Sequence, residues 1–288
     1  MGPAPFRVLV FSKTTAYRHA SIPAGIAMFR RLAKASSSSS SQTVTTPAFD
    51  VDASEDAAAV FTPDNLTRYR VLVFLQTTGD FLDAAQLRAL EAYVRRGQGG
   101  VVGIHAATVG MPSRTVDRDG FYGRLLGAVF TDHPPPQPGR VLLTAPQHPV
   151  VAPLLAKVAS STALKATGTE AADAAEADEA APLFFSHVDE WYNYQPSSFA
   201  VAATKTAAST AAAAAAAANL EILLSADETS YTGGAHGPNH PIAWVWPDFD
   251  ATGTRVFYTA LGHYDALYAD EAFVAHLRNA LLWAAKAI

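Results

Sequence analysis

Cysteine is absent from all 288 residues of this chain. Its absence excludes disulfides, thiolate metal sites and cysteine nucleophiles, although it fits either redox compartment. Any reactive side chain must therefore come from another residue type. The nine histidines are the main candidates, because imidazole titrates near neutral pH and binds metals.

Basic residues and long apolar runs are also scarce. The chain has 21 Lys and Arg against 26 Asp and Glu, a net charge of -5, which argues against a nucleic-acid partner. No run is long enough to span a bilayer, Met1–Arg7 has no signal-peptide layout, and Phe6 stands where a myristoylation signal has Ser or Thr. We therefore expect a soluble, cytoplasmic protein that binds neither nucleic acid nor membrane.

The apolar content is high enough for a large core. Hydrophobic residues make up 49% of the chain, and we expect a single domain over residues 1–288. Three tracts biased to Ser or Ala are predicted to be low-complexity insertions, near 36–46, 168–182 and 205–219. Such tracts offer little to bury, so we assign no chemistry to them.

Short apolar runs alternate with helical patterns in the first half of the chain. Phe6–Phe11, Val71–Leu75 and Gly100–Ile104 predict buried strands, and helical patterns begin near Pro23 and Asp83. Further strands are expected over 49–53, 140–143, 220–224, 242–246 and 255–260, before a last helix from about residue 270. This alternation predicts an α/β fold with a mostly parallel central sheet.

Polar loops follow two of these strands, at the sheet edge where parallel α/β proteins bind ligands. Thr14–Ser21 follows the first strand and contains His19, while Gln76–Asp80 follows another and contains Thr78. We expect these side chains to project over the carboxyl ends of the strands. A plain turn or a helix cap, for example at Ser21, is the alternative for each loop.

His105 directly follows the strand Gly100–Ile104. Gly103 and the small Ala106 permit a sharp turn there, as a nucleophile elbow requires. Backbone N–H groups at such a turn could bind an anion or a polarised oxygen. A buried histidine bonded to a carbonyl would have the same sequence, so a structural role stays open.

Two adjacent carboxylates, Asp189 and Glu190, precede the aromatic residues Trp191 and Tyr192. Carboxylates supply general bases, and aromatic faces suit the apolar face of a sugar ring. Neighbouring residues on a strand point to opposite sides, so we expect only one of the two carboxylates to face a site. The alternative is a solvated acid beside a core tryptophan.

The later histidines have no standard zinc spacing. His240 lies in a glycine-rich segment and His263 follows a predicted strand, and neither belongs to a motif with two histidines one helical turn apart. The cofactor is therefore left open, with a divalent metal as one option.

Seven matching segments lie in order along the chain, at 8–11 with 17–22, 74–80, 103–107, 130–134, 189–192, 240–244 and 258–263. Taken together, they resemble the ThuA-like (trehalose utilisation) family, a branch of the class I glutamine amidotransferase-like superfamily. The resemblance implies a flavodoxin-like three-layer sandwich and a carbohydrate substrate. In the amidotransferase relatives the elbow holds a cysteine. The matching position here is His105, which excludes glutaminase activity.

We therefore predict a carbohydrate-active enzyme of sugar catabolism, of lyase or hydrolase type, that acts on a saccharide or keto-sugar by His/carboxylate acid–base chemistry. The saccharide could be a small molecule or an oligomer, and a homo-oligomeric protein stays open. The predicted catalytic residues are His19, His105, Asp189, Glu190 and His263, and the predicted substrate-binding residues are Thr14, Thr15, Thr78, His133, Trp191, Tyr192 and His240. The alternatives are a sugar-binding or sensing protein with the same pocket, and a scaffold protein with dispersed histidines.

Overall fold

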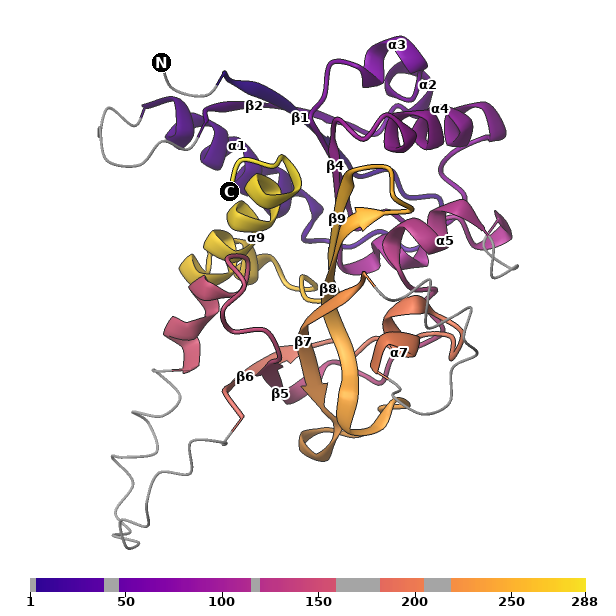
Figure 1. Cartoon of the computed structure of the whole chain (residues 1–288). Coiled ribbons are helices and arrows are strands. Elements are labelled where there is room, and N and C mark those ends of the chain that lie inside the picture. The colour runs from indigo at the N-terminus through magenta and orange to yellow at the C-terminus, as the bar shows by residue number, and fades with distance from the viewer. Residues whose placement is uncertain (1–3, 39–46, 115–119, 159–181, 205–218) are drawn as a thin grey trace, which may run out of the picture.

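A computed structural model describes residues 4–38, 47–114, 120–158, 182–204 and 219–288 (Figure 1). The three predicted insertions fall mainly outside these described residues. The start of the first insertion is described and forms the end of helix α1 (Ile22–Ser38), and the last residue of each of the other two is described as well.

Five parallel strands form one half of the central sheet. They are β1 (Phe6–Phe11), β2 (Phe49–Ser54), β3 (Val71–Leu75), β4 (Gly100–Ile104) and β9 (Thr254–Thr259). Their order is β2-β1-β3-β4-β9, and each neighbouring pair is parallel. This is the strand order of flavodoxin-like folds, in which ligands bind at the carboxyl edge.

Four further strands extend the same sheet beyond β9 with antiparallel pairing. They follow in the order β8 (His240–Phe249), β7 (Glu221–Asp227), β5 (Gln137–Leu143) and β6 (Phe184–Asp189). The sheet is therefore parallel in one half and antiparallel in the other.

Helices cover both faces of the parallel half. Figure 1 shows α1 and α9 on one side of the sheet and α4 and α5 on the other, which confirms the predicted three-layer α/β architecture. The helices are α2 (Ala57–Val60), α3 (Pro63–Leu66), α4 (Ala84–Arg95), α5 (Phe121–Leu126), α7 (Phe199–Thr204) and α9 (Glu271–Ala284). No helix in the described ranges combines the length and the apolar character that a membrane crossing requires.

Short 3-10 helices complete the secondary structure. They are η1 (His105–Val109), η2 (Pro112–Arg114), η3 (Ala152–Leu154), η4 (Glu228–Ser230), η5 (Gly237–Asn239) and η6 (Asp265–Ala269). The predicted helix cap at Asp83 is present in the structure. Asp83 caps α4 by accepting from the backbone N–H groups of Ala85 and Gln86 at 2.8 Å each, and the Gln86 side chain accepts from Asp83 N–H at 2.9 Å.

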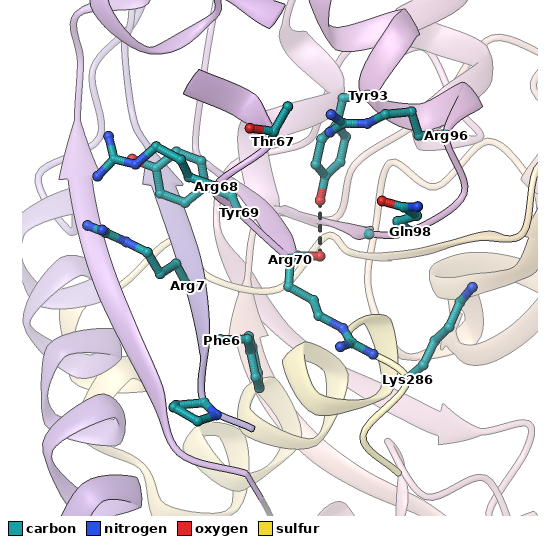
Figure 2. A pocket seen from close by; sticks show the side chains of 12 residues that line it. Phe6, Arg7, Thr67, Arg68, Tyr69, Arg70, Tyr93, Arg96, Gln98 and Lys286 are labelled. Atoms are coloured by element: carbon teal, nitrogen blue, oxygen red, sulfur yellow. Dashed lines mark hydrogen bonds between the residues drawn. The ribbon is translucent and has the colours of Figure 1, made fainter. Parts of the chain in front are cut away.

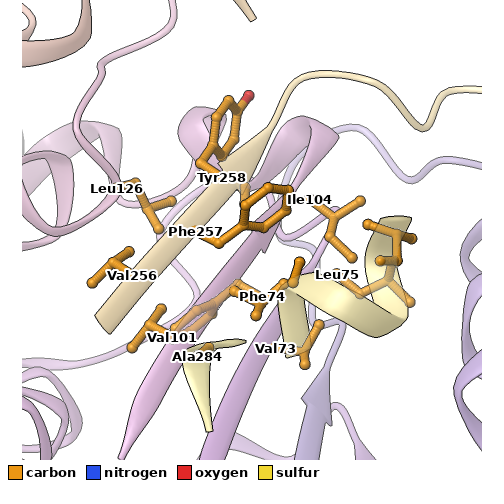
Figure 3. Packing of buried hydrophobic residues seen from close by; sticks show 14 of the residues in the cluster. Val73, Phe74, Leu75, Val101, Ile104, Leu126, Val256, Phe257, Tyr258 and Ala284 are labelled. Carbon is orange, nitrogen blue, oxygen red and sulfur yellow. The ribbon is translucent and has the colours of Figure 1, made fainter. Parts of the chain in front are cut away.

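The hydrophobic core lies between the sheet and the α-helices that cover its two faces (Figure 3). β3 and β4 are buried on both faces, which explains why their sequences are apolar throughout and do not alternate. α9 packs against the start of β4 so closely that a Cβ at Gly100 would lie 2.3 Å from the carbonyl oxygen of Ala284. Glycine at this position therefore allows the helix to approach the sheet, and the carboxyl ends of the same strands carry the candidate site.

Candidate functional site

Four side chains from distant segments meet at the carboxyl edge of the parallel strands. His19 follows β1, His105 follows β4 and His263 follows β9, whereas Glu190 follows β6 of the antiparallel half. One potential ligand atom of each residue lies within 4.8 Å of those of the other three. We call His19, His105, Glu190 and His263 the histidine centre. Their convergence confirms that the histidines are not dispersed over the surface.

The distances within the histidine centre are short. The Nε2 atoms of His19 and His105 lie 3.2 Å apart. Oε2 of Glu190 lies 3.3 Å from Nε2 of His105, 3.2 Å from Nδ1 of His263 and 3.9 Å from Nε2 of His19. A fourth imidazole, that of His133, reaches the other carboxylate oxygen at 3.5 Å. One carboxylate is thus surrounded by four imidazoles.

His105 occupies the sharp turn that the sequence predicts after β4. Its φ is 53°, in the left-handed region, a conformation that costs a non-glycine residue about 1–3 kcal/mol and is concentrated at functional sites. Its Nδ1 lies 2.6 Å from the carbonyl oxygen of Ala260. Because a carbonyl only accepts, Nδ1 carries the proton and Nε2 faces the centre with a lone pair when the ring is neutral. His105 is thus a buried histidine bonded to a carbonyl, and its second nitrogen also faces the histidine centre.

Gly262 provides the space for this turn. Its φ is 140°, and a Cβ at this position would lie 3.2 Å from Cβ of His105 and 2.9 Å from the Tyr268 hydroxyl. A side chain here would crowd Cβ of His105 and displace its side chain. The glycine therefore helps to position the histidine centre.

Asp189 and Glu190 have different roles, as the alternation along a strand predicts. The Asp189 carboxylate is fully buried and accepts from the backbone N–H of Gly262 at 2.9 Å and from that of His263 at 3.3 Å. Burial alone would raise the pKa of Asp189, but a hydrogen bond from His187 and the nearby His105 hold it below its usual value. Asp189 therefore positions the loop of His263 as an anion and does not face the centre.

The ionisable groups of the histidine centre have pKa values that are shifted apart. Burial would raise the pKa of Glu190, but the imidazoles around it outweigh burial and hold that pKa far below its ordinary value. Burial, together with the nearby His105 and His263, lowers the pKa of His19 more than Glu190 raises it. The contact with Glu190 raises the pKa of His263 above 6.5 despite partial burial. The centre thus holds an anion, a neutral imidazole and an imidazole that binds a proton more readily, the pattern of an acid–base pair.

Several polar atoms of the histidine centre have no hydrogen bond. Nδ1 of His19, Oε2 of Glu190 and Nδ1 of His263 are buried without a hydrogen-bond partner among the described residues, although the last two atoms are close to each other. Buried polar atoms that lack partners call for an ion, a water or a ligand. Here two of them lie among the potential ligand atoms of the centre.

The donor set fits a divalent transition metal. Three imidazole nitrogens and one carboxylate oxygen are ligands that zinc prefers, and atoms bound tetrahedrally to zinc lie about 3.3 Å from one another. The separations of 3.2 and 3.3 Å match that value, whereas the 3.9 Å separation is longer and the set as a whole spans up to 4.8 Å, so the side chains would have to move closer around an ion. The hydrogen bond from His105 Nδ1 to a carbonyl is the usual support for a metal-bound histidine.

One side of the histidine centre is open to solvent, and two exposed tyrosines flank it. The side chains of His133 and His263 are 32% and 18% exposed. Tyr17 packs edge-on against His19 with ring centroids 4.8 Å apart, and Tyr264 packs in the same way against His263 at 4.6 Å. Both tyrosines are among the exposed large hydrophobic residues. These two tyrosines were not predicted as site residues from the sequence, although each lies within two residues of a predicted histidine.

Tyr192 forms the inner wall of the histidine centre. Its hydroxyl lies 3.1 Å from Nε2 of His105, and its ring stacks on those of His105 and His133. Burial and the nearby Glu190 carboxylate raise the pKa of Tyr192 well above 10, so the hydroxyl keeps its proton and can donate it in a hydrogen bond.

Two predicted binding residues lie behind this wall. Trp191 is fully buried, stacks on Tyr231 and donates to the carbonyl of Gln137 at 3.1 Å, so neither face is free for a sugar. His240 is buried, with Nδ1 2.8 Å from Glu228 and Nε2 2.8 Å from the carbonyl of Tyr192. The structure does not bring these two side chains into the centre.

The predicted threonines organise the loop that carries His19. The Thr78 hydroxyl donates to the carbonyl of Tyr17 at 2.7 Å, and Thr15 contacts the carbonyl of Thr78 by its N–H at 2.9 Å and by its hydroxyl at 3.4 Å. Thr14 pairs with Thr78 in an isolated bridge. These residues join the loops after β1 and β3, and they contact the loop backbone.

Comparison with known families identifies the chain. The family model described as ThuA, trehalose utilisation, matches residues 7–284. The chain belongs to the ThuA family. This confirms the resemblance seen in the seven sequence segments and places the chain in a family described by sugar metabolism.

A solved structure supports the fold of this ThuA-family chain. A putative ThuA-like protein from Parabacteroides merdae ATCC 43184 is 17% identical with a TM-score of 0.55, over 98% of this chain and 90% of that chain. A structure titled mmIFT52 N-terminal domain is 10% identical with a TM-score of 0.48, over 96% of this chain and 97% of that chain. This similarity is too low to support the fold. The comparison with curated proteins gave no match.

Proposed function

We propose that this ThuA-family chain is a carbohydrate-active enzyme of lyase or hydrolase type, with the histidine centre as its catalytic site. The observation that carries the proposal is the convergence of three imidazoles and one carboxylate from four distant segments, with ligand atoms within 4.8 Å. The family description supports a sugar substrate, a saccharide or a keto-sugar. The exposed rings of Tyr17 and Tyr264 beside the centre suit the apolar face of a sugar.

The shifted pKa values support separate proton-transfer roles in the metal-free form of the centre. His19, with its lowered pKa, is the general base that takes a proton from water in hydrolysis, or from a carbon beside a keto group in elimination. His263, with its raised pKa, is the general acid that protonates the departing glycosidic oxygen. Each such group accelerates a reaction by about a hundred- to ten-thousandfold.

A divalent metal would change which residue transfers protons. Bound by His19, His105, Glu190 and His263, it would polarise a sugar oxygen or lower the pKa of a bound water. His133 is then the imidazole left for proton transfer, because it is partly exposed and lies 3.5 Å from Glu190 without belonging to the donor set. Metal analysis of protein purified without a histidine tag distinguishes the two forms.

The test is a screen of saccharides and their keto derivatives against untagged protein, read by the masses of the products. Turnover is measured as purified, after chelation, and after readdition of zinc. We expect a product from at least one substrate, and His19→Gln to lower turnover at least about a hundredfold. His148→Gln is the matched control, since His148 is a half-buried histidine against Trp283, outside the centre, and it should retain turnover.

Other outcomes reject the proposal. Tight binding of a saccharide with no product after long incubation would assign the chain to sugar sensing. If neither binding nor product is found, a sugar substrate is rejected. Equal losses of turnover in His19→Gln and His148→Gln would show that the centre has no special role.

A further inference from the structure

A second concave site lies at the opposite end of the parallel strands. It is a cavity of about 630 Å³ lined by the start of β1, the segments before β3 and β4, the end of α4 and Lys286 just after α9 (Figure 2). Because the histidine centre lies at the carboxyl ends of the same strands, the two sites are on opposite edges of the sheet. We call this cavity the basic pocket.

Five cationic side chains line the basic pocket, and no carboxylate is among its lining residues. They are Arg7, Arg68, Arg70, Arg96 and Lys286. Figure 2 shows Arg7 and Arg68 on one side and Arg96 and Lys286 on the other, with Arg70 between them. Among the described residues only Asp52 forms a salt bridge with one of the five, pairing with Arg7 at 2.6 Å. A chain with a net charge of -5 thus gathers positive charge in one cavity, which attracts anions.

Neutral groups hold most of these cations in place. The guanidinium of Arg68 lies over the ring of Tyr69 at 5.7 Å and donates to the Asn65 side chain at 2.8 Å, and that of Arg96 lies over the ring of Tyr93 at 5.4 Å. Aromatic faces and amide oxygens orient a guanidinium without neutralising it. The charges of Arg68 and Arg96 therefore remain for a ligand.

Helix ends explain only part of this arrangement. Arg70 donates to the carbonyl of Ala285 at 2.9 Å and Lys286 donates to that of Gly97 at 3.0 Å, and cations near the carbonyl ends of α9 and α4 are stabilising by themselves. Arg68 contacts neither of these two ends; it follows α3, a helix of four residues, and is held by the Asn65 side chain of that helix. A ligand held between the two sides of the pocket would account for both sets of residues.

We propose that the basic pocket binds a compact, phosphate-bearing small molecule. Arginine matches phosphate oxygens in a two-pronged geometry, and the cavity has the size of ordinary small-molecule sites. Tyr69 and Tyr93 are buried and each has an arginine over its ring. The third aromatic residue of the lining, Phe6, is buried and stacks on Phe49 with ring centroids 5.6 Å apart. No open aromatic face among the lining residues is therefore left to stack a nucleobase, which favours an inorganic or sugar phosphate over a nucleotide.

The test is calorimetric titration of the full chain with inorganic pyrophosphate and, separately, with a hexose 6-phosphate at low ionic strength. We expect saturable binding of one molecule per chain, weakened at least tenfold in the double variant Arg68→Gln/Arg96→Gln. The matched control is Arg30→Gln/Arg88→Gln, which removes the same charge from exposed positions outside the pocket, and it should bind as the parent does. The tighter of the two probes identifies the source of the phosphate.

Two results would overturn the proposal. One is the absence of saturable binding for both probes, and the other is an equal loss of affinity in the two double variants, which would mean attraction to net charge alone. Because the readout is binding and the variants leave the histidine centre intact, failure here is distinct from failure of the proposed catalytic function.

Discussion

Glu190 controls the charges at the histidine centre. It is a nearly buried anion that contacts His105 and His263 within about 3.3 Å, so it raises the proton affinity of one imidazole and offers an oxygen to a metal. Asp189, its neighbour, is also an anion but contacts backbone N–H groups. Of two adjacent carboxylates, one thus faces the histidine centre and the other holds the backbone of its loop.

Glu190→Gln should therefore disable the histidine centre while keeping its shape. We expect turnover to fall at least about a hundredfold and the pKa of His263 to return toward 6.5, because the carboxylate that raises it is gone. The measurements are product formation and the pH titration of the histidine ring protons by NMR.

Glu228→Gln is the control for this substitution. Glu228 also faces a buried histidine, with His240 at 2.8 Å, but lies outside the centre. It should leave turnover within a few-fold of the parent. Equal losses in both variants, or an unmoved His263 titration in Glu190→Gln, would contradict the assignment.

The sequence was sufficient to predict the residues that follow strands but not those defined by distant packing. His19 and His105 each follow a predicted parallel strand, and His263 follows a predicted strand that the structure pairs in parallel with β4, so their meeting at one edge follows from the fold. Trp191 is next to a carboxylate in the sequence, as a sugar-stacking residue often is. In the structure, however, the ring of Tyr231, forty positions away, stacks on it. Exposure of Tyr17 likewise depends on how the loops after β1 and β3 join.

At the scale of elements, α9 carries a histidine that senses acid without belonging to the site. His276 is fully buried between the rings of Phe257 and Phe273, with Nδ1 2.7 Å from the carbonyl of Val150. Burial is the largest influence and lowers the pKa of His276 to about 4. The folded protein therefore keeps this ring neutral at pH values where the unfolded chain protonates it.

We expect His276 to make folding less favourable as the pH falls from 6.5 to 4. Over that range only the unfolded chain binds the extra proton, so the free energy of unfolding falls by up to about 3 kcal/mol through this residue. His276→Asn, which can still donate to Val150 and does not titrate, should reduce the decline. Urea unfolding at pH 7, 5.5 and 4.5 measures it, and parallel declines in parent and variant would contradict the prediction.

The antiparallel half of the sheet shows where strand prediction ends. The strands 220–224, 242–246 and 255–260 were expected, but their directions were not. A signal was present, because residues 250–253 between β8 and β9 are too few for a parallel crossover, which needs a dozen or more residues. Asp250 and Ala251 have positive φ in this turn, a hairpin conformation that a strand-by-strand reading does not detect.

For the whole molecule, the two halves of the sheet share one site. The parallel half contributes the three histidines and the antiparallel half contributes Glu190 through the segment after β6. A ligand bound at the centre therefore contacts both halves, and its binding energy stabilises the complete fold.

If the centre holds a metal, zinc should raise the unfolding temperature of the chelated protein in a single transition. Ligand at about a hundred times its Kd adds about 2.7 kcal/mol, which corresponds to several degrees. Differential scanning calorimetry measures the shift, and Glu190→Gln should lose most of it. Two separate transitions, or the same shift in the variant, would contradict a site shared by both halves.

The exposed ring of Tyr17 also gives experimental access to the centre. It is 68% exposed and packs edge-on against His19, in a chain that has no thiol of its own. In the variant Tyr17→Cys the new cysteine would be the single thiol for a maleimide dye, because no native cysteine has to be removed first. The fluorescence of the dye would then report on molecules that enter or leave the exposed side of the centre.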